Sequence, residues 1–159
     1  MARVIGKGVS PTLLKLAEKH PENVRLEGYV GELESVFAHA TAALAPLRFG
    51  SGIKINVLDA LARGVPVIAT SAGVDGLPVS IEGADGCIVE DDFSRWPELL
   101  AEMANAERNG ELSNAAAAFF ERTYAREVVM AQYDEIFFAD TDSEITNDAD
   151  SAATSAWPA

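Results

Sequence analysis

The 159-residue sequence is poor in cysteine, in basic residues and in long apolar runs. Its single cysteine, Cys87, excludes an intrachain disulfide and is typical of a reducing compartment. No segment approaches the roughly 20 apolar residues needed to span a bilayer, and residues 1–8 lack the apolar core of a signal peptide. We therefore expect a cytoplasmic protein that is not transmembrane.

Basic residues are outnumbered: 12 Lys and Arg face 25 Asp and Glu, for a net charge of −13. This acidity argues against nucleic acid as a partner, because a phosphate backbone would be repelled. Residues 140–159 contain five of the acidic residues, no basic residue and almost no large apolar group. Such a segment cannot bury enough surface to offset its ordering entropy. We expect a folded domain over 1–138 and an acidic, disordered tail over 139–159.

Short apolar segments alternate with helix-like segments along the folded part, which predicts an α/β fold with a parallel sheet and right-handed crossovers. Strands are expected at 3–5, 24–26, 41–47, 65–69 and 86–89, and helices at 11–20, 32–40, 53–63, 97–107 and 112–138. The strand at 41–47 is nearly all apolar, as expected for a strand buried on both faces. Tyr133 and Phe137, one helical turn apart, are expected to pin the last helix to the body of the fold.

The segment from Pro46 to Asp59 combines the end of a strand, a glycine loop and the first turns of a helix. Gly50 and Gly52 let the backbone approach a ligand closely. A helix that opens from such a loop presents unpaired amides and a positive dipole end, which suit a phosphate. Arg48, just before the loop, could pair with a phosphate through two hydrogen bonds.

Helical geometry places Gly52, Asn56 and Asp59 on one side of the predicted helix. Asp59 is therefore positioned to accept hydrogen bonds from vicinal hydroxyls, as a sugar ring requires. Lys54 lies roughly opposite Asn56, but in the first turn its long side chain can still bend toward a ligand. From the residues alone, Asp59 could equally be a solvated helix residue, and Lys54 a surface lysine. No Gly-x-Gly-x-x-Gly opens a helix after a strand, which disfavours a dinucleotide oxidoreductase.

The order and spacing of four motifs carry a family resemblance. The chain from Arg3 to Phe138 resembles the C-terminal, donor-binding domain of glycosyltransferase family 4, a group of retaining GT-B enzymes. The resemblance implies a Rossmann-like parallel sheet with flanking helices, here without its first strand. It also implies a nucleotide-diphosphate sugar as donor, with no metal and no cofactor. The motifs are Val4-Ile5-Gly6-Lys7-Gly8, Val24-Arg25-Leu26-Glu27-Gly28-Tyr29-Val30, Ala45-Pro46-Leu47-Arg48-Phe49-Gly50-Ser51-Gly52-Ile53-Lys54 and Asp59-Ala60-Leu61-Ala62-Arg63-Gly64-Val65-Pro66-Val67-Ile68-Ala69-Thr70.

By this resemblance, backbone amides at the loop-to-helix junction hold the diphosphate and Asp59 binds the ribose; no catalytic residue is assigned. Three positions depart from the family pattern. Asp59 replaces a longer glutamate, Ser51 stands where many members have a second glutamate, and Asn56 replaces a lysine. Only Lys54 could then compensate for the phosphate partner that Asn56 does not provide. The implied donor-binding residues are Arg48, Gly50, Ser51, Gly52, Ile53, Lys54 and Asp59.

A complete GT-B enzyme also has an N-terminal acceptor domain, and transfer takes place between the two domains. We therefore expect this chain to need that missing domain as a partner and to be inactive alone, with peripheral membrane association of the full enzyme left open. Two other functions fit the same residues. One is a non-catalytic or split α/β module that associates with a partner chain through an open sheet edge. The other is a GT-B protein of the nucleotide-sugar epimerase type.

Overall fold

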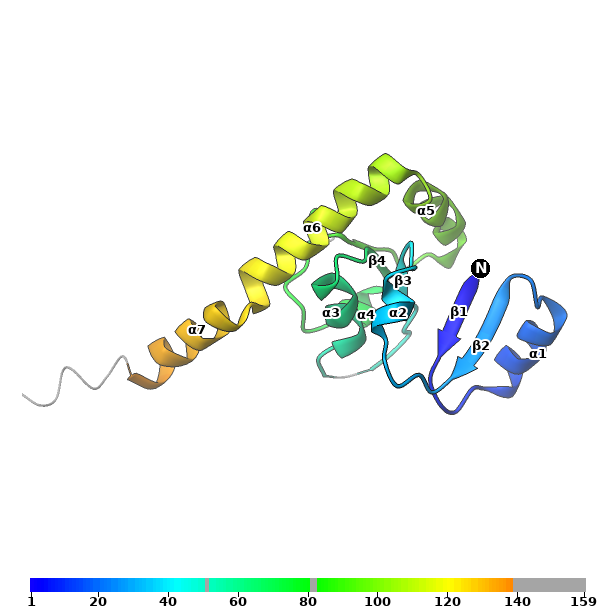
Figure 1. The fold of residues 1–159 in the computed structure, drawn as a ribbon, viewed down its shortest axis with the longest axis horizontal. Coiled ribbons are helices and arrows are strands. Elements are labelled where there is room, and N and C mark those ends of the chain that lie inside the picture. The colour runs from blue at the N-terminus through cyan, green and yellow to red at the C-terminus, as the bar shows by residue number, and fades with distance from the viewer. Residues whose placement is uncertain (51, 81–82, 139–159) are drawn as a thin grey trace, which may run out of the picture. The chain divides into compact units, whose positions relative to one another are not determined.

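The computed structural model describes residues 1–50, 52–80 and 83–138, so the tail predicted at 139–159 lies outside the described residues. The chain forms two compact units, one comprising residues 1–41 and one beginning at Ala42 (Figure 1). The elements follow in the order β1 (Ala2–Ile5), α1 (Pro11–Lys19), β2 (Val24–Gly28), α2 (Glu34–Phe37), β3 (Ala43–Ala45), α3 (Ile55–Ala62), β4 (Val67–Ala69), α4 (Ser71–Val74), β5 (Cys87–Val89), the 3-10 turn η1 (Phe93–Arg95), α5 (Trp96–Met103), α6 (Ala106–Tyr124) and α7 (Arg126–Phe138).

The first unit is a β-α-β arrangement. Strands β1 and β2 pair in parallel, and α1 connects them. Helix α1 begins where the sequence predicts: Pro11 occupies the first turn, and the Ser10 hydroxyl accepts a hydrogen bond of 3.3 Å from the Leu13 amide. This cap satisfies one of the amides that a helix N-terminus leaves without a partner.

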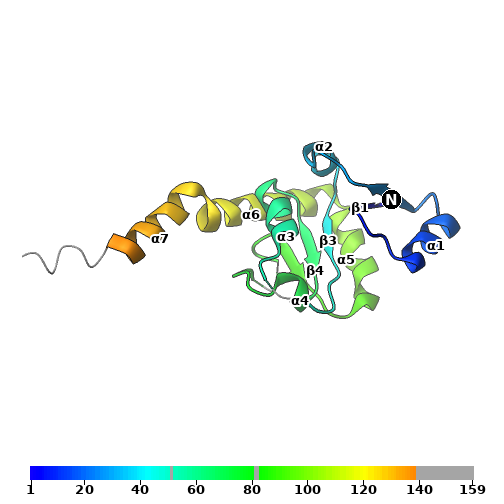
Figure 2. The ribbon, with the colours of Figure 1, turned by 90° about the horizontal axis from the view of Figure 1, so that it is seen from below.

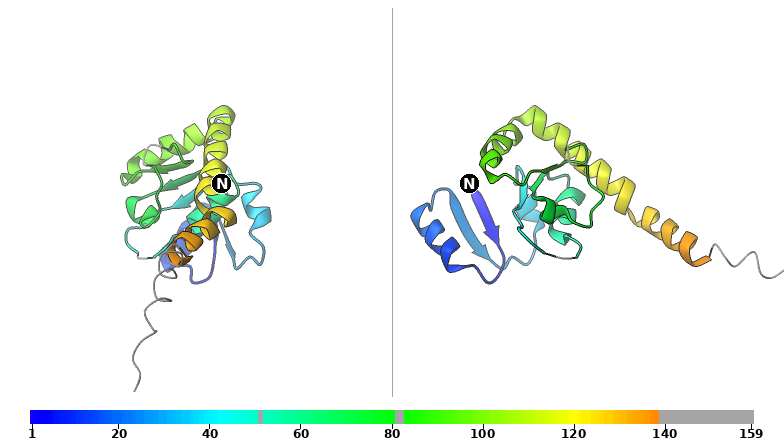
Figure 3. Two further views of the ribbon diagram at one scale, coloured as in Figure 1. Left: turned by 90° about the vertical axis from the view of Figure 1, so that its left-hand side faces the viewer. Right: turned by 180° about the vertical axis from the view of Figure 1, so that it is seen from behind.

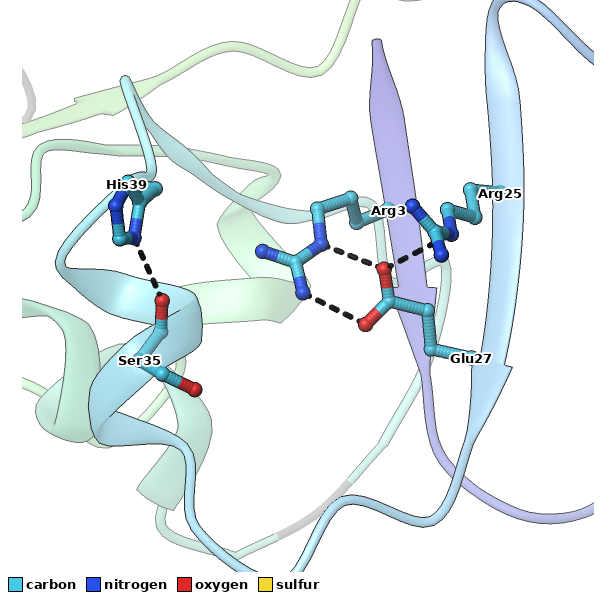
Figure 4. A network of polar contacts seen from close by, with 5 residues as sticks. All are labelled: Arg3, Arg25, Glu27, Ser35 and His39. Carbon is cyan, nitrogen blue, oxygen red and sulfur yellow. Dashed lines mark hydrogen bonds and ion pairs between the residues drawn. The ribbon is translucent and has the colours of Figure 1, made fainter.

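Charges on the two strands of this unit are matched across the pair (Figure 4). Arg3 and Arg25 are register partners, and Glu27 neutralises both. The Arg3 guanidinium donates two hydrogen bonds of 2.7 Å to the Glu27 carboxylate, and these lower the pKa of Glu27. Just after α2, His39 Nδ1 lies 3.0 Å from the carbonyl oxygen of Ser35, so this ring nitrogen has a backbone hydrogen-bond partner.

The second unit is built on a parallel sheet in the order β3-β4-β5. Strand β4 is completely buried. Its Ile68 packs with α5 and the start of α6, in a core cluster that also contains Trp96, Leu99, Met103 and Leu112. Because side chains alternate along a strand, Val67 and Ala69 point to the opposite face. Figure 2 shows α3 and α5 on either side of β3 and β4.

Strand β3 is less buried than its apolar sequence predicts. Leu44 is 45% exposed, and Ala43 and Ala45 are only half-buried. The prediction of burial on both faces is therefore wrong for β3. It pairs with β4 on one side and is an edge strand of this sheet, and an edge strand has fewer neighbours to cover it.

The helix predicted over 112–138 is in fact two helices, α6 and α7, separated at Ala125. Ala125 adopts an extended conformation with ψ 145°. Just before it, the Tyr124 ring packs on Phe119 and Phe120 with centroid distances of 5.9 Å. No glycine or proline marks this break in the sequence, so local propensity gives no signal for it.

The prediction that Tyr133 and Phe137 pin the last helix to the fold is also wrong. Helix α7 has no buried residue and continues from α6 without covering the strands (Figure 3). Tyr133 and Phe137 are 54% and 68% exposed and stack on each other, with ring centroids 5.8 Å apart. Among all the described residues, no helix combines the length and apolar character that crossing a bilayer requires.

Candidate functional site

A pocket of about 300 Å³ lies where β3 ends and α3 begins. The chain between these elements passes through Gly52, whose φ of 83° is in the left-handed region that favours glycine. The pocket walls are mostly aliphatic, and two side chains bring polar groups, Lys54 and Asn56. The lining residues are Leu44, Ala45, Pro46, Leu47, Ile53, Lys54, Ile55, Asn56, Val57 and Gly73.

Lys54 is the buried cation of this pocket. The residue is 8% exposed, and its ammonium donates a hydrogen bond of 2.8 Å to the Gly52 carbonyl oxygen. Within residues 1–50, 52–80 and 83–138, no carboxylate forms an ion pair with it. The surface-lysine alternative is therefore wrong, because this positive charge is held inside the protein.

Helix α3 begins at Ile55 and presents its N-terminus to the pocket. The Lys54 carbonyl accepts the first helical hydrogen bonds, from the amides of Val57 at 2.9 Å and Leu58 at 3.1 Å. The Asn56 amide, in the first turn, has no hydrogen-bond partner among the described residues. A free amide, the positive end of the helix dipole and a buried ammonium together favour an anion.

Thr70 and Gly73 connect the α4 side of the pocket to β3. Neither residue was among the site residues expected from the sequence. The Thr70 hydroxyl donates to the Leu47 carbonyl and accepts a hydrogen bond of 3.1 Å from the Gly73 amide. A Cβ at Gly73 would lie 2.5 Å from the Ala45 carbonyl oxygen, so only glycine permits this approach. The available signal was the hydroxyl that follows a buried strand, which is equally typical of an ordinary helix cap.

The other predicted donor-binding residues lie around the pocket rather than in it. Arg48 is exposed and lies over the Phe93 ring, 5.9 Å from its centroid. Asp59 is paired with Arg63, which donates to the Asp59 carboxylate at 3.4 Å and to its backbone carbonyl at 2.9 Å. Gly50 is near Lys54, since a Cβ at Gly50 would lie 3.9 Å from the ammonium nitrogen. Ser51 lies outside the described residues.

A larger, more open pocket of about 650 Å³ lies between α5 and α6 and has the opposite electrostatic character. It is lined by four glutamates and one arginine, Glu98, Glu102, Glu107, Glu111 and Arg108, and Arg108 is already paired with Glu111 at 3.1 Å. Such a lining repels an anion. Across the part of the chain that the structure describes, no group of three or more His, Cys, Asp or Glu is arranged to hold a metal ion.

Cys87, Trp96 and Phe119 have structural roles. Cys87 is fully buried, and burial raises the pKa of its thiol to about 12, so it carries no nucleophilic thiolate near neutral pH. Trp96 packs in the core cluster and donates a hydrogen bond of 3.0 Å to the Glu90 carbonyl. Phe119 is buried in α6.

The model of one protein family, described as glycosyl transferases group 1, matches residues 2–106, which is well over half of the chain. The chain belongs to the glycosyl transferases group 1 family. The match includes β1 to α5 and therefore the whole pocket. No curated protein sequence matches this group 1 chain.

Solved structures share the fold of this glycosyl transferases group 1 chain. It matches TarM with a TM-score of 0.70 at 17% identity, covering 86% of this chain and 28% of TarM. WaaG, a glycosyltransferase involved in lipopolysaccharide biosynthesis, matches at 0.66 and 18% identity over 86% of this chain and 38% of WaaG. HepE from Anabaena, solved in complex with UDP, matches at 0.60 and 18% identity over 86% of this chain and 40% of HepE.

These matches confirm the predicted fold class: parallel strands flanked by helices, as in GT-B glycosyltransferases. The chain spans well under half the length of each of these structures.

Proposed function

We propose that this chain is the donor-binding half of a retaining glycosyltransferase, which transfers a sugar from a nucleotide-diphosphate sugar to an acceptor. The observation that carries the proposal is the buried ammonium of Lys54 beside the N-terminus of α3, in a pocket with no anionic lining residue. A diphosphate supplies the negative charge that this arrangement favours. Membership of the glycosyl transferases group 1 family gives the reaction class.

The volume of the pocket indicates which part of the donor would bind inside it. About 300 Å³ lies at the lower limit for small-molecule sites, so the pocket accommodates the diphosphate and leaves the nucleoside and sugar outside. The amides after Gly50, including those of Ser51, Gly52 and Ile53, hold the phosphates together with Lys54. Asp59 lies one turn into α3 and binds the ribose once its carboxylate exchanges Arg63 for the hydroxyls. Arg48 adds a second positive charge after leaving Phe93.

Several features support UDP as the first nucleotide to test. HepE, whose fold is similar, was solved with UDP. The net negative charge of the chain and the glutamate-lined pocket between α5 and α6 disfavour an anion elsewhere, whereas the pocket at Lys54 holds a buried cation. We place the reaction in the cytoplasm, where nucleotide sugars are made and where the single buried thiol of Cys87 stays reduced.

Isothermal titration of UDP and GDP into the purified chain tests this proposal, with uridine as the control that lacks the diphosphate. We expect binding of UDP or GDP in the micromolar to millimolar range and none of uridine, because the pocket recognises the phosphates. Absence of binding by both diphosphates at millimolar concentration would contradict the proposal. The chain alone is expected to show no transfer, and addition of an acceptor domain in trans is expected to be necessary for turnover.

A second candidate function is association with a partner chain, and the exposed apolar side chains favour it. Leu44 on the edge strand β3 is 45% exposed, and α7 exposes Met130, Tyr133, Ile136 and Phe137 by 48% to 76%. Apolar groups of this size usually mark an interaction surface when they lie together. Sedimentation velocity, together with the UDP titration, distinguishes the two functions. A monomer that binds UDP supports the donor-binding half, whereas a chain that self-associates and does not bind nucleotide supports the partner-binding function.

A further inference from the structure

The pocket is formed by segments from three places in the chain: the end of β3, the N-terminus of α3 and the first turn of α4. The described residues of the loop between β3 and α3, 46–50 and 52–54, include two glycines and belong to no helix or strand. The shape of the loop must therefore be fixed by specific contacts. Lys54 provides one by donating to Gly52, and a single buried hydroxyl, that of Thr70, provides another.

Thr70 follows β4 directly and is 4% exposed. Its hydroxyl donates to the Leu47 carbonyl, in the segment that leaves β3, and lies 3.5 Å from the Ala45 carbonyl. The same oxygen accepts the Gly73 amide at 3.1 Å, and the Thr70 amide donates to the Ala45 carbonyl at 3.3 Å. One side chain thus joins the two walls of the pocket, since Leu47 and Gly73 both line it.

The first turn of α4 is fixed from its other side as well. The Asp91 carboxylate, after β5, accepts hydrogen bonds from the Ser71 amide at 2.8 Å and from the Ser71 hydroxyl at 2.6 Å. Gly73 in turn approaches Ala45 so closely that a Cβ would meet the carbonyl at 2.5 Å. With α4 held in this way, loss of the Thr70 hydroxyl acts mainly on the Leu47 side of the pocket, where the loop begins.

We propose that Thr70 is a positioning residue of the nucleotide site: its hydroxyl fixes Leu47 against α4 and so sets the start of the loop that binds the diphosphate. This inference rests on the proposed function. Thr70 does not line the pocket and touches no ligand in this role. Its contribution passes through the Leu47 carbonyl, which would lose this hydrogen bond if the hydroxyl were removed, whereas the Gly73 amide would keep its 2.8 Å hydrogen bond to the Thr70 carbonyl.

The test compares Thr70→Val, which keeps the shape and removes the hydroxyl, with Thr70→Ser, which keeps the hydroxyl. Ser113→Ala is the matched control, because the Ser113 hydroxyl also donates to a backbone carbonyl, that of Gly64 at 2.5 Å, and is remote from the pocket. We expect Thr70→Val to weaken UDP binding about tenfold or more, and Thr70→Ser and Ser113→Ala to change it less than about threefold. Both Thr70→Val and Ser113→Ala are expected to lower the melting temperature.

Amide hydrogen exchange without ligand separates this inference from the proposed function. Thr70→Val is expected to speed exchange of the amides from Leu47 to Val57, and Thr70→Ser to leave them unchanged. If the wild-type chain does not bind UDP but this exchange pattern holds, the proposed function fails and the positioning role stands. If Thr70→Val does not fold, Thr70→Cys, with its weak thiol donor, replaces it.

Three results would overturn the inference. One is unchanged exchange and unchanged UDP affinity in Thr70→Val. Another is a loss in Thr70→Ser as large as that in Thr70→Val, since the hydroxyl would then not matter. The last is an equal effect of Ser113→Ala on the Leu47–Val57 amides, which would assign the change to general loss of stability.

Discussion

The Lys54 ammonium lies 2.8 Å from the Gly52 carbonyl oxygen, inside the loop through which the chain passes from β3 to α3. This contact holds a positive charge in a residue that is 92% buried. A buried charge with a neutral partner remains costly unless an anion neutralises it. The contact therefore shapes the loop and, in the function we propose, prepares the pocket for a phosphate.

Replacement of Lys54 by methionine is expected to weaken UDP binding about 10- to 100-fold, because a hydrogen bond to a charged group contributes about 1.5–3 kcal/mol. Lys54→Arg keeps the positive charge and is expected to lose less UDP affinity. Lys15→Met, on the exposed side of α1, is the control for a general change in net charge. Calorimetry with UDP measures all three, and equal affinities of Lys54→Met and wild type would exclude a role for this ammonium.

We expect Asp59 to contribute less to stability than to nucleotide binding. Its pair with Arg63 is a partly exposed i,i+4 contact, and such pairs contribute about 0.3–0.5 kcal/mol. Asp59→Ala is therefore expected to leave the urea midpoint almost unchanged, while it weakens UDP binding about fivefold or more through loss of the ribose contact. Pyrophosphate affinity should not change. A parallel loss of UDP and pyrophosphate affinity would show that Asp59 acts on the phosphates or on the fold.

Two glycines with positive φ allow the cost of backbone strain to be measured separately from the cost of a steric clash. Gly86 has φ 72°, and an added Cβ would lie 2.5 Å from the Ala116 Cβ, whereas Gly76 has φ 82° and open space around it. Gly76→Ala is expected to cost about 1–2 kcal/mol from backbone strain alone. Gly86→Ala adds a clash with α6 and is expected to cost about 3 kcal/mol or more. Urea unfolding measures both, and similar losses would mean that α6 moves away freely.

Asp91 makes stability depend on pH in a defined direction. Hydrogen bonds from the Ser71 hydroxyl and amide lower the pKa of Asp91 in the folded protein. Its stabilising effect is therefore fully present above the unfolded pKa of about 3.9 and is lost as the pH falls through the lower folded pKa. Asp91→Asn is expected to reduce stability between pH 5 and 8 and to differ less from wild type as the pH falls below about 4. Asp75→Asn, at an exposed residue, is the control.

The elements were predictable wherever a local signal marks them. Ser10 and Pro11 start α1, Gly64 follows α3, and the alternation of strands with helices gives the parallel pairing. The break at Ala125 has no such signal, because neither glycine nor proline stands there. The exposure of Tyr133 could not be predicted either, because an apolar helix face in the sequence does not reveal which element, if any, packs against it.

For the site, the sequence indicated the loop but not how its side chains are used. Glycine spacing pointed to the junction at Gly52, where the pocket lies. Lys54 was expected inside a helix over 53–63, but α3 begins at Ile55, so Lys54 lies just before the helix and its side chain is buried. The partners of Arg48 and Asp59 are Phe93 and Arg63, and only three-dimensional proximity reveals the first of these.

The most direct test of the nucleotide site is a titration of the ¹⁵N-labelled chain with UDP, followed through backbone amide shifts. We predict that the largest shifts fall on Gly52, Lys54, Asn56 and Gly73, and that uridine at the same concentration does not shift these amides. Shifts centred on the acidic pocket between α5 and α6, or no shift at millimolar UDP, would contradict this prediction.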